Sequence, residues 1–164
     1  SALKRLAYAQ LLILGFSLTH AIQAAPASSL MSGFNPLIGG QWVLGSTYQT
    51  YTWGPDQQSV FGESFVIHNG EKALGAKGLW YFDPASKTIK GVFVATNMPF
   101  TVLHYRSHFE AGTLISQVRS LDNLGTENHY QETIRVTQPD AYLWELTEAE
   151  PAGNTMKAEF HRAP

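Results

Sequence analysis

Hydrophobic and polar residues alternate along most of the chain in short runs, a pattern typical of β-strands with one buried face. The runs occupy residues 41–53, 60–68, 73–82, 88–96, 100–110, 113–121, 128–137, 142–148 and 155–162. Glycine, proline, asparagine or aspartate separates the runs over hairpin-length gaps, which are too short for the crossovers between parallel strands. We therefore predict an all-β domain of about nine antiparallel strands in up-and-down order, closed into a β-barrel.

The stretch Asn35-Pro36-Leu37-Ile38-Gly39-Gly40-Gln41-Trp42 predicts a short helical turn before the first strand. Asn35 suits the N-cap, and Pro36 suits the first helical position because its missing N–H costs nothing there. The two glycines then let the backbone turn sharply into an extended strand that opens with Trp42.

The hairpin around Pro139-Asp140-Ala141 allows a prediction of strand register. A three-residue loop sets Val136 opposite Trp144 and Arg135 opposite Glu145. Apolar residues then face apolar ones and a cation faces a carboxylate, so we predict this loop.

The final run places Arg162 on the same face as Met156, Ala158 and Phe160. An arginine therefore ends the apolar face of the last strand, at the end of the barrel where Trp42 opens the first. We predict that Trp42 and Arg162 stack there and form the structural closure of the barrel.

The first 24 residues have the anatomy of a secretory signal peptide. Lys4 and Arg5 form a positive start, residues 6–18 an apolar core, and Ala21-Ile22-Gln23-Ala24 a small-residue cleavage site. The alternative is an uncleaved membrane anchor, but the apolar core is shorter than the roughly 20 residues that span a bilayer. We predict cleavage and a soluble exported protein, periplasmic or secreted, with no membrane span after signal removal.

The rest of the chain is expected to form one domain. Residues 25–34 are small, contain proline and serine, and lack periodicity, so we expect a flexible lead-in. Residues 35–164 are expected to form the barrel, because 44% hydrophobic and 15% charged residues suit one packed core. Aromatic residues at 12% and 14 glycines favour strands and tight turns.

Charge and motif content exclude several classes of function. A net charge of −2 without a basic cluster argues against a nucleic-acid partner. The absence of cysteine excludes disulfides, thiolate metal sites and cysteine nucleophiles. No nucleophile elbow, metalloprotease motif or phosphate-binding loop occurs in the sequence.

Gly40-Gln41-Trp42 near the start and an arginine ending the last strand resemble the calycin arrangement. In lipocalins and their relatives a G-x-W motif opens strand one, and a terminal arginine packs across that tryptophan. The chain from Asn35 onward resembles, more specifically, a bacterial calycin-like family whose members have no established activity. The similar segments are Pro36-Leu37-Ile38-Gly39-Gly40-Gln41-Trp42, Trp80-Tyr81-Phe82-Asp83-Pro84, Pro139-Asp140-Ala141-Tyr142-Leu143-Trp144-Glu145-Leu146 and Phe160-His161-Arg162. The resemblance implies a lipocalin-like barrel and no particular chemistry.

The leading functional hypothesis is a barrel that binds a small, largely apolar ligand. It rests on the aromatic-rich strands, the calycin resemblance and the lack of a catalytic motif. The side chains that we expect to line the cavity are Tyr48, Trp80, Phe93, Tyr105, Tyr130 and Trp144. The same side chains could instead fill a small barrel, which leaves a structural or interaction protein as an open alternative.

The second hypothesis is an enzyme with an interior polar cluster. A two-residue turn at Ala111-Gly112 sets Arg119 opposite His104, with Glu132 and Tyr130 within reach on the following strand. Buried together, these groups would form a charged site of the kind that protein interiors keep for function.

We expect the opposite face of this hairpin to be inward, with Leu103, Tyr105 and Val118 inside the barrel. His104, Arg106 and Arg119 then form a solvent-facing row. Burying them against one carboxylate would cost several kcal/mol of desolvation that the pairing does not recover in full.

No metal or cofactor is expected. His104 and His108 lie four residues apart on one strand, about 13 Å at ~3.3 Å per residue, which is too far to share a metal. His161 beside the final arginine resembles the nitrobindin family of calycin-like barrels, whose haem iron is held by a histidine near the C-terminus. Here the alternation points His161 outward, so the sequence does not support haem.

Overall fold

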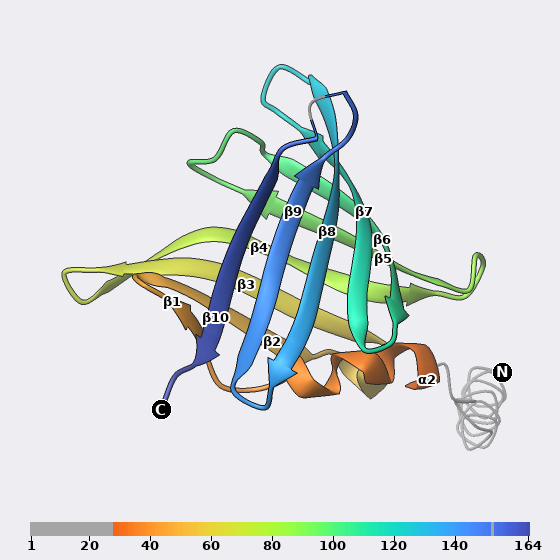
Figure 1. Ribbon diagram of the computed structural model, residues 1–164, viewed down its shortest axis with the longest axis horizontal. Helices are drawn as coiled ribbons and strands as arrows, with labels where there is room; N and C mark the ends of the chain where they lie inside the picture. The colour runs from red at the N-terminus through yellow and green to blue at the C-terminus, as the bar shows by residue number, and fades with distance from the viewer. Residues whose placement is uncertain (1–27, 152) are drawn as a thin grey trace, which may run out of the picture.

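The computed structural model describes residues 28–164 apart from Ala152. The predicted signal peptide lies outside the described residues. Within them, the chain forms a closed barrel of ten antiparallel strands in up-and-down order, which confirms the predicted fold class (Figure 1). The strands are β1 (Trp42–Leu44), β2 (Thr47–Trp53), β3 (Ser59–His68), β4 (Glu71–Asp83), β5 (Thr88–Ala95), β6 (Val102–Glu110), β7 (Thr113–Leu121), β8 (Glu127–Gln138), β9 (Ala141–Glu148) and β10 (Thr155–Arg162).

The strand count is ten, not nine, because the predicted run 41–53 is divided. Gly45 has φ +58°, a backbone conformation that side-chain-bearing residues rarely adopt, and it turns the chain back on itself. β1 and β2 consequently form a hairpin of their own, with Leu44 opposite Thr47. Only β1 remains to pair with β10 and close the barrel.

The predicted register of the β8–β9 hairpin is wrong by two residues. Ile134, not Val136, lies opposite Trp144, and Arg135 lies opposite Leu143. The turn consists of Pro139 and Asp140, because Gln138 pairs with Ala141. A shift in register between Val136 and Gln138 accommodates the extra residue on β8, as a β-bulge does. Apolar residues still face one another, so the bulge satisfies the same packing rule that the longer loop was expected to satisfy.

The β6–β7 hairpin has the predicted register, with His104 opposite Arg119 and Arg106 opposite Gln117. Its inward face is also the predicted one. Val118 is 1% exposed and Leu103 9% exposed, whereas the Arg119 side chain is 44% exposed. The polar row therefore faces solvent and the apolar row faces the barrel interior.

One end of the barrel is closed by a short helical segment, α2 (Ser28–Met31) and the 3₁₀ helix η1 (Ser32–Leu37), which we call the plug (Figure 1). Met31, Phe34 and Leu37 recur every third residue, as the three-residue turn of a 3₁₀ helix requires for one face. All three are at most 2% exposed. The expected flexible lead-in therefore does not extend through residues 31–34, because two of its apolar side chains are buried in the core.

The helical segment also begins earlier than predicted. Asn35 and Pro36 lie inside η1 rather than at its start, and Met31 occupies the N-cap position without a side-chain hydrogen bond. Burial of the apolar face, not capping by Asn35, accounts for this helix. The indole Nε1 of Trp42 donates to the Leu37 carbonyl at 2.9 Å and ties η1 to β1.

The closure between β1 and β10 involves two residue pairs, Trp42 with Arg162 and Val43 with His161. The Arg162 guanidinium lies 4.2 Å from the centre of the Trp42 ring, so the expected stacking is present. The same guanidinium donates to the carbonyls of Gly39 and Pro36, the latter at 2.9 Å. Arg162 thus joins the last strand, the first strand and the plug.

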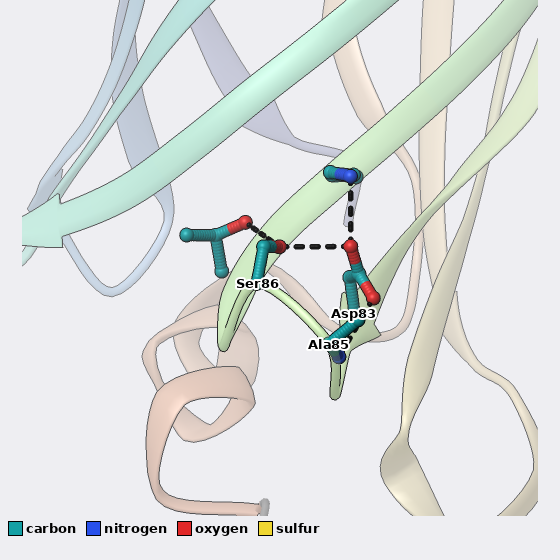
Figure 2. Close-up of polar contacts among 5 residues, drawn as sticks. Asp83, Ala85 and Ser86 are labelled. Carbon is teal, nitrogen blue, oxygen red and sulfur yellow. Dashed lines mark hydrogen bonds and ion pairs between the residues drawn. The ribbon is translucent and has the colours of Figure 1, made fainter.

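The β4–β5 turn lies at the same end of the barrel as the plug and is held by one carboxylate (Figure 1, Figure 2). Asp83 accepts hydrogen bonds from the Ala85 backbone N–H at 3.0 Å and the Ser86 hydroxyl at 2.8 Å. It also forms an ion pair with Lys90 at 2.7 Å. The hydrogen bond from Lys90 is the largest cause that lowers the pKa of Asp83 to about 2.

Candidate ligand-binding cavity

The barrel encloses a cavity of about 640 Å³ between the plug and the opposite, open end. Inward-facing side chains alternate along β2, β4, β6, β8 and β9, as expected for strands with one buried face. The apolar and aromatic side chains that line the cavity are Tyr51, Ala76, Trp80, Phe93, Met98, Pro99, Phe100, Leu103, Tyr105, Tyr130, Ile134, Trp144, Leu146 and Met156. This volume lies in the range of sites for small molecules.

Three aromatic rings form one wall of the cavity. Trp80 lies 4.6 Å from Phe93 and 5.7 Å from Tyr105, and Phe93 lies 5.4 Å from Tyr105, measured between ring centres. Glycine makes room for these rings. A Cβ atom at Gly62 would lie 2.9 Å from Phe93, and one at Gly91 would lie 2.9 Å from Trp80. Small residues on the neighbouring strands therefore set the position of the aromatic wall.

Glu132, on β8, is the one charged residue in the core of the described chain and is 8% exposed. Its Oε2 accepts a hydrogen bond from the Trp144 indole Nε1 at 3.1 Å, and the Tyr105 hydroxyl also donates to this carboxylate. Burial raises the pKa of Glu132 from its ordinary value of 4.5 to about 7, although both hydrogen bonds oppose that shift. Near neutral pH the carboxyl therefore exists in both protonation states.

A second polar group in the interior is a pair of tyrosine hydroxyls, from Tyr51 on β2 and Tyr142 on β9. Tyr51 donates to the Gln49 Oε1 at 2.9 Å, so the Tyr142 hydroxyl, 3.1 Å away, donates to Tyr51. Burial raises the pKa values of both tyrosines, and the nearby Glu132 charge raises them further. The two hydroxyls therefore remain protonated and act as hydrogen-bonding groups, not as anions.

One interior polar atom lacks a partner. The Trp80 residue lines the cavity and is 4% exposed, and its indole Nε1 has no hydrogen-bond partner among the described residues. A buried donor without an acceptor costs about 1–3 kcal/mol. Such groups occur where a bound molecule or water completes the site.

The open end of the cavity is bordered by apolar and acidic side chains. Met156 is 58% exposed and Met98 39% exposed, which leaves flexible apolar groups at the rim. Glu148 also lines the cavity, and it accepts a hydrogen bond from Asn154 at 3.1 Å. The opening is therefore apolar with a carboxylate at its edge.

Five of the six aromatic residues that we expected to line the cavity do so: Trp80, Phe93, Tyr105, Tyr130 and Trp144. Tyr48 does not. Its ring stacks on Phe65 at 5.3 Å, outside the set of cavity residues. Thr47 and Gln49 face the cavity instead, and because Tyr48 lies between them in the alternation its side chain faces the other side of the sheet.

The polar cluster proposed for an enzyme is not assembled. Glu132 lies opposite Ser116 and points inward, whereas Arg119 lies opposite His129 on the outer face. Arg119 and His129 both contact Glu127 at 3.5 Å. A broad depression of about 920 Å³ on this outer face is lined by these exposed groups, so it does not isolate them from water as the barrel interior does.

The sequence pattern did not predict that Tyr51 lines the cavity or that Glu132 contacts Trp144. Tyr51 stood in a run whose internal turn was not predicted. The wrong β8–β9 register placed Trp144 two residue pairs farther from Glu132 than it is. The position of Glu132 is the sequence feature that could have indicated this contact. Glu132 lies two residues before the buried Ile134, so both side chains face the barrel interior.

Comparison with models of known protein families and with curated proteins finds no match to the chain. Over residues 28–164 without Ala152, no helix has the length and apolar character needed to cross a bilayer. The geometry of the barrel interior is therefore the basis for a functional assignment.

Proposed function

We propose that this chain is a calycin-like binding protein that holds a small, largely apolar molecule inside its barrel. The observation that carries the proposal is the cavity of about 640 Å³, walled by aromatic side chains and open at one end. A barrel built only for structure would fill this space, because interiors pack closely. The Trp42–Arg162 stacking supports the calycin assignment.

The cavity also supports binding over catalysis. Its polar lining consists of carboxyl, hydroxyl, amide and indole N–H groups, which suit orienting a ligand. Arg119 and His104, the expected partners of an enzymatic cluster, lie on the outer face. We further propose that the protein works after export, which the signal-like residues 1–24 support.

The test is a titration of the purified chain with N-phenyl-1-naphthylamine, an uncharged aromatic probe whose emission rises in apolar sites. We expect saturable binding at one site per chain. Ala76 lines the cavity, so Ala76→Phe should fill it and weaken probe binding at least tenfold. Ala73, exposed on the same strand, provides the matched control Ala73→Phe, which should bind as the wild type does.

Two results would contradict the proposal. The first is the absence of saturable probe binding to the folded wild-type chain. The second is equal binding by the two phenylalanine variants, since that would place the probe on an outer surface.

A further inference from the structure

We propose that the cavity selects an amphiphile whose polar end is an amine, and that Glu132 holds this cationic end inside the barrel. This inference rests on the proposed binding function and adds the chemical class of the ligand.

The charged side chains that line the cavity are carboxylates. In the part of the chain that the structure describes, no lysine, arginine or histidine lines it. Glu132 lies in the interior and Glu148 at the rim, while the third lining residue with a carboxylate, Glu63, is already paired with Lys72 and Lys77 at 2.9 and 3.2 Å. A fatty acid or another anionic ligand would therefore lose its hydration without gaining a cation.

Glu132 can accept more hydrogen bonds than its protein partners supply. A carboxylate accepts about four hydrogen bonds through its two oxygens, and the Trp144 and Tyr105 side chains supply two. An ammonium group has only donors, so it matches the unused acceptor positions. It also supplies the positive charge that a buried carboxylate needs to remain ionised.

The aromatic wall of the cavity lies beside this carboxyl. Tyr105 both donates to Glu132 and packs at 5.7 Å from Trp80, so the anion and the ring faces belong to one site. Cations are attracted to the faces of tryptophan, tyrosine and phenylalanine rings, most strongly where water is excluded. The apolar side chains toward the open end, such as Leu146 and Met156, suit the hydrocarbon part of the same ligand.

The test compares three probes of equal chain length, decylamine, 1-decanol and decanoate, as competitors of N-phenyl-1-naphthylamine at neutral pH. We expect decylamine to displace the fluorescent probe at a concentration at least tenfold below that of 1-decanol, with decanoate weakest. Glu132→Gln should bring decylamine within threefold of 1-decanol. The control Glu145→Gln removes a carboxylate that pairs with Lys157 at 3.2 Å outside the cavity, and it should keep the wild-type order.

The wild-type ranking is informative even if Glu132→Gln fails to fold. Decanoate or 1-decanol competing as well as decylamine would overturn the inference while fluorescent-probe binding still supported the proposed function. A decylamine preference that persists in folded Glu132→Gln would also overturn it. Failure of the fluorescent probe to bind at all would instead contradict the proposed function.

Discussion

Glu132 is the charged residue of the described chain whose surroundings differ most from water. Its carboxyl sits among aromatic rings, and two hydrogen bonds replace only part of its hydration shell. An ionised carboxylate in this position destabilises the empty barrel. The protein retains a group that is unfavourable for folding at the place where a ligand would contact it, as sites built for recognition often do.

The pKa of Glu132 predicts how stability depends on pH. The folded-state pKa is about 7 and the ordinary value is 4.5, so between these values the folded chain binds more protons than the unfolded chain. Wild-type stability should therefore fall, relative to Glu132→Gln, as pH rises from 4.5 to 7. The difference should reach about 3 kcal/mol above pH 7.

Urea unfolding of both proteins at several pH values between 4 and 8.5 measures this difference. Glu145→Gln controls for the loss of one negative charge on the outer face. A constant difference between wild type and Glu132→Gln across this range would show that the carboxyl is not desolvated.

Arg162 is the second residue with a predictable effect. Replacing it by alanine removes the guanidinium from the Trp42 ring and leaves the carbonyls of Gly39 and Pro36 without their donor. We expect Arg162→Ala to lower the melting temperature by roughly 5–10 °C, because the stacking contributes about 1–2 kcal/mol and the freed carbonyls add to the loss. Probe binding at 20 °C should not change.

Arg135, exposed on β8, is the matched control for this measurement. Arg135→Ala should leave the melting temperature within about 2 °C of wild type. Equal melting temperatures for the two alanine variants would refute a closing role for Arg162.

At the scale of elements, the plug is the part of the fold on which the floor of the cavity depends. Phe34 is fully buried, and its ring lies 5.5 Å from Trp80 and 5.0 Å from Phe109. Phe34→Ala should lower the free energy of unfolding by about 3–5 kcal/mol, as is usual for truncating a buried aromatic side chain. Leu30, 46% exposed in the same segment, provides the control Leu30→Ala.

Urea unfolding monitored by circular dichroism measures both variants. A loss for Phe34→Ala no greater than that for Leu30→Ala would mean that the plug docks only weakly on the barrel.

The strands themselves were largely predictable, and the exceptions have local physical causes. Alternation identified the inward faces of β6 and β7, because the polar row of His104, Arg106 and Arg119 would have been costly to bury. The β1–β2 turn was missed because Gly45 interrupts a run that is strand-like on both sides. The β8–β9 bulge was missed because it preserves the apolar pairing that was used to choose the register.

At the scale of the whole molecule, most of the cavity lining was predictable, but the presence of the cavity was not. Which aromatic side chains face inward follows from alternation along each strand. Whether they fill the barrel depends on how the ten strands and the plug pack together. Alternation along a single strand carries no information about that packing. The burial of Glu132 belongs to the same class, since its partners Tyr105 and Trp144 come from two other strands.

The two-pair joint between β1 and β10 has a consequence for folding of the protein. Arg162 follows Gly39, whose carbonyl it binds, by 123 residues, so the first strand lacks its last partner until nearly the whole barrel is available to fold. Until then the forming sheet has two unpaired edges, and such edges readily associate with other chains. Association with other chains therefore competes with closure of this barrel until the last strand has paired.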